Sequence, residues 1–141
     1  MSEQQNLDII RRGYEAFGHG DIDTLLGLFD EQIEWVTPGP AELPTSGRRT
    51  GKEQVGQFFG IVNDLFEIHR FEPKEMIAQG DRVVVLGEES ATVKATGKVL
   101  DNSWAHVFTL RDGRVIAFQE YFDTASTVAE LQAAGAKVAK Q

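Results

Sequence analysis

The feature that most constrains this fold is a change in the spacing of apolar residues near Arg70. Up to that point, apolar side chains recur every three or four residues, which is typical of amphipathic helices. Beyond it, apolar and polar residues alternate, which is typical of strands that bury one face. Because helices precede the strands instead of alternating with them, the sequence predicts an α+β fold with an antiparallel meander.

The first half of the chain predicts three helices and one strand. The first apolar stripe consists of Leu7, Ile10, Tyr14 and Phe17. Two glycines end this helix, and Asp21 is a suitable cap for the next one. A strand over 32–36 and a proline-rich loop to about Gly51 follow. Thr50 with Glu53 resembles the capping box of a third helix.

The second half predicts four strands joined by short turns. Each turn contains a glycine beside a polar residue, as in two-residue hairpin loops. The expected strands cover 70–79, 82–94, 98–111 and 114–122, and a last helix runs from about Thr124 to Ala134. We treat residues 1–141 as one domain, because this length is ordinary for a single core.

Composition excludes several kinds of protein. The chain has 141 residues and no cysteine, which excludes disulfides and cysteine nucleophiles. The net charge of −8 and the shortness of the basic clusters argue against nucleic-acid binding. The three histidines lack metal-ligand spacing, so we expect no metal and no cofactor. With no signal peptide and no run of 18 apolar residues, we expect a cytoplasmic protein that does not enter a membrane.

Turn geometry predicts which side chains share one face of the sheet. A two-residue turn at 112–113 places His106 opposite Gln119. The same assumption for the preceding turn places Glu89 opposite Trp104. Because side chains alternate along a strand, these residues point the same way. The predicted face comprises Gly87, Glu89, Asn102, Trp104, His106, Gln119, Tyr121 and Asp123. A one-residue slip in either hairpin would break up this set.

This face is unusual for a plain core, because it carries aromatic rings, acids, a histidine and two amides. Such a mixture is typical of small-molecule sites, which combine apolar walls with a few polar groups. Tyr14, Trp35 and Phe59 are expected to complete the walls. Of the adjacent acids Glu88 and Glu89, only one can face inward. We therefore expect a pocket for a small, largely apolar molecule.

Five segments together resemble a known family: YEAFGHGDIDTLLGLF, IEWVTPG, RRTGKEQVGQFF, WAHVFTLRDGRV and EYFDTAS. Their order and spacing are similar to the SnoaL-like branch of the nuclear transport factor 2-like (NTF2-like) superfamily, over nearly the whole chain. The resemblance implies a cone-shaped, curved mixed sheet wrapped by N-terminal helices around a pocket. The superfamily includes ketosteroid isomerases, polyketide aldol cyclases, limonene-epoxide hydrolases and non-catalytic binding domains, so the fold alone leaves the function open.

Among these activities, the resemblance to the cyclases fits the residues best. Their aspartate base and neighbouring histidine match Asp123 and His106. The steroid isomerases instead have a tyrosine where Gly13 stands and an aspartate where Thr37 stands. The epoxide hydrolases have two aspartates bridged by an arginine, and the arginine position matches Gly87.

Asp123 and His106 are therefore the candidate catalytic residues. As a general base, Asp123 would take a proton from a carbon next to a carbonyl. Its position before the final helix suits capping equally well, and the two roles are compatible. His106 would hydrogen-bond a developing enolate oxygen, or it would simply line the sheet.

Several functions stay open at this point. One is a cofactor-free enzyme that isomerises or cyclises an apolar carbonyl compound. Another is a ligand-binding or dimerisation domain without chemistry, and a third is an epoxide-hydrolase-like enzyme. The resemblance also implies a homodimer. The outer sheet face expected to form it carries Ala105, Val107, Thr109, Ile116, Phe118 and Phe122.

Overall fold

The computed structural model describes residues 2–139, and it describes side chains for residues 2–133. Residues 1, 140 and 141 of the expected domain lie outside this range. The elements are α1 (Glu3–Gly18), α2 (Ile22–Gly27), β1 (Phe29–Thr37), β2 (Gly47–Thr50), α3 (Lys52–Leu65), β3 (Phe66–Gln79), β4 (Arg82–Val93), β5 (Val99–Arg111), β6 (Arg114–Phe122) and α4 (Thr124–Ala139). Helices that precede a strand meander confirm the α+β class.

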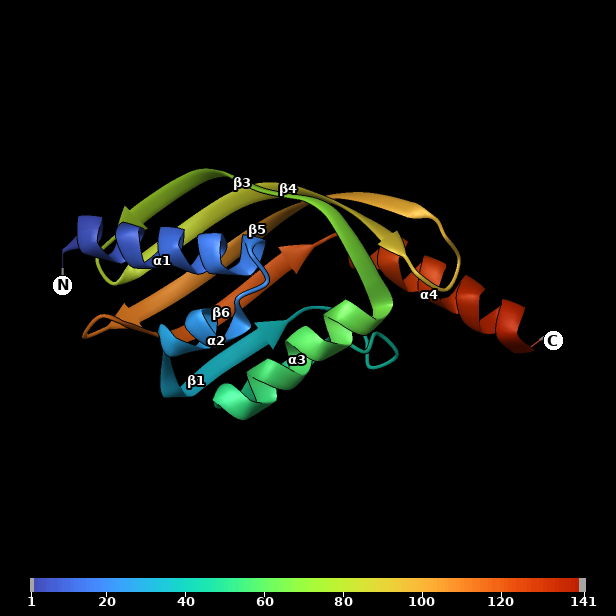
Figure 1. Cartoon of the computed structure of the whole chain (residues 1–141), viewed down its shortest axis with the longest axis horizontal. Helices are drawn as coiled ribbons and strands as arrows, with labels where there is room; N and C mark the ends of the chain where they lie inside the picture. The colour runs from blue at the N-terminus through green and yellow to red at the C-terminus, as the bar shows by residue number, and fades with distance from the viewer. Residues whose placement is uncertain (1, 140–141) are drawn as a thin grey trace.

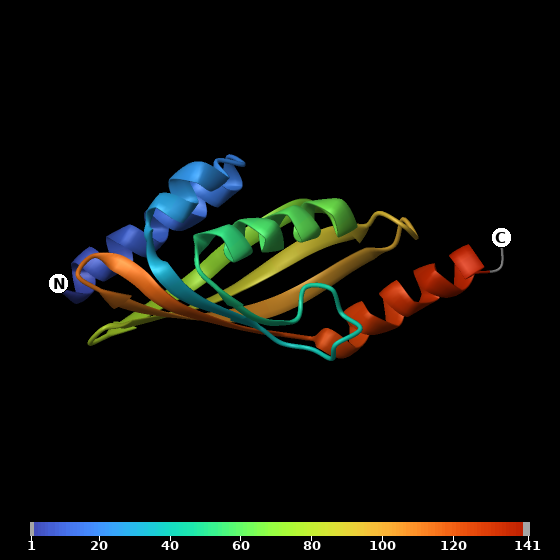
Figure 2. The ribbon, with the colours of Figure 1, turned by 90° about the horizontal axis from the view of Figure 1, so that it is seen from below.

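The strands form one curved, open sheet in the order β2-β1-β6-β5-β4-β3. β1 runs parallel to β6, whereas the other neighbours are antiparallel. α1, α2 and α3 cover one face of this sheet (Figure 1). Seen from below, the same helices form a layer on that face, and α4 extends from the end of β6 away from the body (Figure 2). None of the helices in residues 2–139 is long and apolar enough to span a bilayer.

The loop predicted up to Gly51 contains a short strand that the sequence pattern did not indicate. Residues 47–50 form β2 and pair with the end of β1. The predicted capping box of α3 is wrong, because Gly51 stands at the cap position and no side chain caps the helix there. The hydroxyl of Thr50 instead donates to the Glu34 carboxylate on β1, at 3.1 Å.

The predicted cap at Asp21 is confirmed. Its carboxylate accepts hydrogen bonds from the backbone N–H and the hydroxyl of Thr24, at 3.1 and 2.6 Å. This cap starts α2 directly after α1 ends, so that both helices lie over the same face of the sheet.

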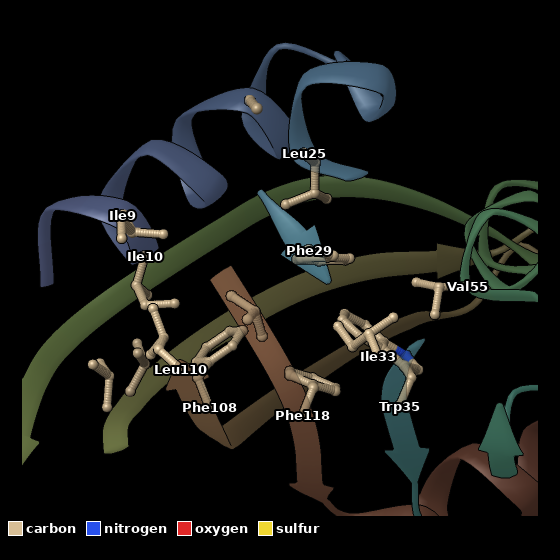
Figure 3. Packing of buried hydrophobic residues seen from close by; sticks show 14 of the residues in the cluster. Ile9, Ile10, Leu25, Phe29, Ile33, Trp35, Val55, Phe108, Leu110 and Phe118 are labelled. Carbon is tan, nitrogen blue, oxygen red and sulfur yellow. The ribbon is translucent and has the colours of Figure 1, made fainter. Parts of the chain in front are cut away.

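The core lies between the three helices and the inner face of the sheet. Figure 3 shows Leu25, Phe29, Phe108 and Phe118 pointing into this space from α2, β1, β5 and β6. Ile33 and Val55 are fully buried in the same cluster. Removing this apolar surface from water is the main source of stability for the fold.

The predicted register between β5 and β6 is wrong beyond the turn. Leu110 pairs with Val115, as a two-residue turn requires, but Thr109 pairs with Ala117. Ile116 is therefore an extra residue, which makes a β-bulge in β6. Because the side-chain period of a strand is two, one inserted residue reverses the face of every residue that follows.

The bulge turns Phe118, Glu120 and Phe122 inward, and it turns the residues between them outward. His106 lies opposite Glu120 instead of Gln119, and Trp104 lies opposite Phe122 instead of Tyr121. Tyr121 is 55% exposed. The predicted outer face is corrected in the same way, because Phe118 and Phe122 do not belong to it.

The predicted register between β4 and β5 is wrong by two residues. Glu89 pairs with Asn102 and Gly87 with Trp104. The turn is longer than predicted, since the N–H of Val93 bonds the carbonyl of Lys98. A shift of two residues preserves the alternation of faces. The β4 and β5 members of the predicted set therefore still point to the same side.

Gly87 is required by the ring that lies over it. A Cβ atom at this position would stand 2.6 Å from the carbonyl oxygen of Glu72 and closer still to the Trp104 ring. We predict that Gly87→Ala destabilises the fold by about 1–3 kcal/mol, because the indole would have to move within a packed core. Chemical denaturation measures the change.

Gly60 provides the matched control, since it lies in α3 with open space around it. Gly60→Ala should increase the stability by up to about 1 kcal/mol through helix propensity. A Gly87→Ala protein as stable as the natural one would contradict the packing argument.

Candidate functional site

A mostly apolar cavity of about 140 Å³ lies between the helices and the inner face of the sheet. Aromatic side chains from α1, α3, β1, β3, β5 and β6 form much of its wall. The polar residues that line it are Tyr14, Thr45, Glu89, Asn102, His106, Glu120 and Thr127. Apolar walls with a few convergent polar groups are the usual composition of a small-molecule site.

A chain of two hydrogen bonds crosses one side of this cavity. The hydroxyl of Tyr14 on α1 lies 2.8 Å from Nδ1 of His106 on β5. Nε2 of His106 lies 3.0 Å from Oε2 of Glu120 on β6. His106 is only 5% exposed, so these two contacts satisfy both nitrogens of a buried imidazole.

The proton on His106 decides what Tyr14 offers to a ligand. When His106 is neutral and donates to an ionised Glu120, its Nδ1 accepts the Tyr14 hydroxyl proton. When His106 is protonated, Nδ1–H donates to the Tyr14 oxygen, and the hydroxyl proton is free for another acceptor. Burial and the charge of Glu120 raise the pKa of Tyr14 well above 10, so Tyr14 stays a donor at neutral pH.

Aromatic stacking fixes the orientation of the imidazole. The Trp104 and His106 rings are nearly parallel, with 4.0 Å between their centres. The Phe71 ring stacks on Trp104, with 4.8 Å between their centres. The Tyr14 ring is also parallel to His106, at 6.0 Å. Trp104 thus supports His106 from behind and is not itself one of the cavity-lining residues.

Glu89 is an inward-pointing acid that faces the same cavity. Burial, and then the negative charge of Glu120, raise the pKa of Glu89 from 4.5 to about 7. Across the described residues, no hydrogen bond or cation offsets these two effects. A carboxyl group with this pKa is poised between its two protonation states at neutral pH.

The structure brings together six of the ten residues predicted for the site. Those that line the cavity are Tyr14, Trp35, Phe59, Glu89, Asn102 and His106. Trp104 lies behind them, and the bulge places Gln119 and Tyr121 on the outer face. The neighbouring acid Glu88 is exposed and pairs with Arg70 at 3.5 Å.

Asp123 lies outside the cavity, where it caps α4. Its carboxylate accepts from the backbone N–H and the hydroxyl of Ser126, at 3.2 and 2.7 Å. The hydroxyl of Ser126 makes the largest contribution to lowering the pKa of Asp123 below its ordinary value. An exposed carboxylate with a lowered pKa is a weak base, so the structure supports only the capping role.

Glu120 lines the cavity and contacts His106, and it is the candidate site residue that the sequence pattern did not indicate. Alternating polar and apolar residues show which side chains of a strand face the core. This alternation stops in the apolar run from Val115 to Phe118, where every side chain suits either face of the sheet. This run is the one signal in the sequence that a bulge interrupts β6.

The raised pKa of Glu89 predicts a pH-dependent stability. The folded protein binds more protons than the unfolded chain between pH 4.5 and about 7, so stability falls as pH rises through this range. Glu89→Gln removes this loss. We predict that the variant gains up to about 3 kcal/mol of unfolding free energy at about pH 8 and nothing near pH 4.

Urea unfolding at several pH values measures this difference. Glu88→Gln is the control, because Glu88 is exposed on the opposite face, and it should show no such pH-dependent gain. A Glu89→Gln protein with the same pH profile as the natural one would contradict the assignment.

Comparisons with known proteins agree with this architecture. A family model described as the SnoaL-like domain matches residues 10–118. An NTF2-like protein from Burkholderia xenovorans LB400 is 34% identical with a TM-score of 0.80, over 89% of this chain and 94% of that one. TerC, co-crystallised with polyporic acid, is 29% identical with a TM-score of 0.80, over 87% and 95% of the two chains.

A protein of Mycobacterium tuberculosis H37Rv that is described as uncharacterized is 27% identical over 128 residues, which are 90% of this chain and 96% of that protein. The expected resemblance is thus confirmed by sequence and by structure. The chain belongs to the SnoaL-like domain family and has the NTF2-like fold.

Proposed function

We propose that this protein is a cofactor-free enzyme that moves a proton on a small, apolar carbonyl compound. The observation that carries the proposal is an unpaired carboxyl group, Glu89, in the same cavity as the Tyr14–His106–Glu120 chain. A base near neutral pKa and a supported hydrogen-bond donor are the two groups that enolisation requires.

Glu89 is the base in this proposal. In its ionised form it takes a proton from the carbon next to the carbonyl group. The electron pair of the C–H bond then forms a C=C bond, and the π electrons of the C=O bond move to the oxygen. Its pKa of about 7 gives it both the strength to accept this proton and the ability to return it. In a substrate with a C=C bond conjugated to the enolate, return of the proton to the far carbon of that bond completes an isomerisation.

Tyr14 stabilises the oxygen that becomes negative. The Tyr14 hydroxyl is free to donate to the enolate oxygen in the form of the site in which both ring nitrogens of His106 donate, one to Glu120 and one to the Tyr14 oxygen. If the enolate carbon attacks a second carbonyl in the same molecule, the new alkoxide takes the proton from Glu89, which completes an aldol cyclisation. In this scheme the base is Glu89, in place of Asp123.

A ligand-binding domain without chemistry is the second candidate. The large apolar share of the cavity wall favours it, and TerC, which shares the fold, is co-crystallised with polyporic acid. An epoxide-hydrolase-like mechanism is less well supported, because no arginine occurs among the described residues that line the cavity.

Hydrogen–deuterium exchange tests the enzymatic proposal. We expect the protein to speed exchange of the α-protons of apolar ketones, such as α-tetralone and 2-acetylnaphthalene, in deuterated buffer followed by NMR. Glu89→Gln should reduce this rate at least about 100-fold, since general bases contribute this much. Tyr14→Phe should also reduce it, while Asp123→Asn and Glu88→Gln should leave it within about twofold of the natural rate.

Retained exchange in Glu89→Gln, or loss of exchange in Asp123→Asn with the fold intact, would contradict the assignment of the base. Ligand binding without exchange in the natural protein would favour the second candidate.

We also propose that the protein is a homodimer that pairs through the outer face of the sheet. After correction for the bulge, this face carries Leu86, Ala105, Val107 and Tyr121, and two of its large side chains, Leu86 and Tyr121, are 39% and 55% exposed. Exposed apolar side chains gathered on one face are typical of interaction surfaces.

The cytoplasmic location expected from the sequence stays a prediction.

The mass in solution tests the dimer. Tyr121→Glu and Leu86→Glu should each shift the protein from dimer to monomer at micromolar concentration, because a charge would be buried without a partner. Gln57→Glu on the exposed side of α3 is the control and should leave the mass unchanged. A natural protein that is monomeric by light scattering at this concentration would overturn the proposal.

A further inference from the structure

We propose that Glu89 and Glu120 exclude anions from the cavity, so that the substrate carries no negative charge when it binds. This inference rests on the proposed function, because it concerns the same cavity, and it narrows the substrate class. Uncharged ketones and phenols would be accepted, whereas free carboxylic acids and phosphate esters would be rejected.

The titratable groups that face the cavity come from only a few elements. Tyr14 lies on α1, Glu89 on β4, His106 on β5 and Glu120 on β6. The parts of α2, α3, β1 and β3 that line the cavity are aliphatic or aromatic, and the loop at Thr45 and the start of α4 at Thr127 add only hydroxyls. No lysine or arginine occurs among the described lining residues.

Arg49 contacts two of the lining residues, Thr45 and Phe58, but its guanidinium is engaged outside the cavity. The Arg49 guanidinium donates to the backbone carbonyls of Thr45 and Pro44, each at 3.0 Å. It also lies over the Phe58 ring, 5.1 Å from its centre. These contacts hold the loop against α3, and Arg49 is not a lining residue.

The balance of charge in the cavity is therefore negative or neutral. A protonated His106 compensates only Glu120, to which it is bonded, and Glu89 has no cationic partner among the described residues. An anionic ligand would meet at least one carboxylate in apolar surroundings, where like charges repel more strongly than in water. The faces of the aromatic walls are also electron-rich and do not attract anions.

Binding of three naphthalene compounds of similar size tests the inference. The probes are 2-acetylnaphthalene, which is a neutral ketone, 2-naphthoate, which is an anion, and 1-(2-naphthyl)ethylamine, which is a cation. Calorimetry gives each dissociation constant at about pH 8, where Glu89 is ionised, and at about pH 6, where it is protonated.

At about pH 8 we expect 2-naphthoate to bind at least about tenfold more weakly than the ketone, and the amine to bind no more weakly than the ketone. The ratio of the naphthoate dissociation constant to that of the ketone should fall at about pH 6. The same ratio should fall equally in Glu89→Gln at about pH 8. Glu88→Gln should leave this ratio unchanged, because Glu88 is exposed on the outer face.

Equal binding of naphthoate and ketone to the natural protein would overturn the inference, as would a gap that Glu89→Gln leaves unchanged. Failure of all three compounds to bind would overturn it too, because the cavity would then not accept an aromatic ligand. The failure of the enzymatic proposal is distinct: ketones would bind with the expected charge selectivity, but their α-protons would not exchange.

Discussion

The arrangement of the site depends on a buried histidine whose two ring nitrogens must both be satisfied. His106 stands on β5, one of the two central strands, and reaches Tyr14 on α1 and Glu120 on β6. These contacts connect the helical layer to two neighbouring strands across an apolar space. An imidazole without such partners would carry the full cost of desolvation. The same contacts that stabilise His106 therefore also position a tyrosine and a carboxylate at the cavity.

The bulge at Ile116 makes this arrangement possible. It turns Glu120 inward to meet His106 and turns Tyr121 outward. It also brings Phe118 onto the inner face, where its ring stacks on Trp35 at 3.8 Å. One inserted residue thus fixes the polar contact and the aromatic packing beside it, and gives the outer face its exposed tyrosine.

Glu89 illustrates the tension between stability and function in the cavity. Ionising this buried carboxyl group lowers the free energy of unfolding, and its raised pKa reflects that loss of stability. Nothing in the described residues compensates this cost, although a lysine or arginine on a neighbouring strand would do so. In the proposed function, the uncompensated carboxylate supplies a base of suitable strength and also rejects anions.

Local patterns in the sequence were enough to predict the α+β class, the positions of most elements, the Asp21 cap and the shared face of Glu89, Asn102 and His106. They succeeded because periodicity and turn residues act over short distances, and because the two-residue error in the β4–β5 turn left the alternation of faces intact. The partner of His106 and the position of Asp123 depended on a one-residue bulge inside an apolar run, where the sequence pattern does not show which side chains face inward. Only packing of the whole sheet against the helices decides which of them face inward, since each side chain in the run is equally suited to either face.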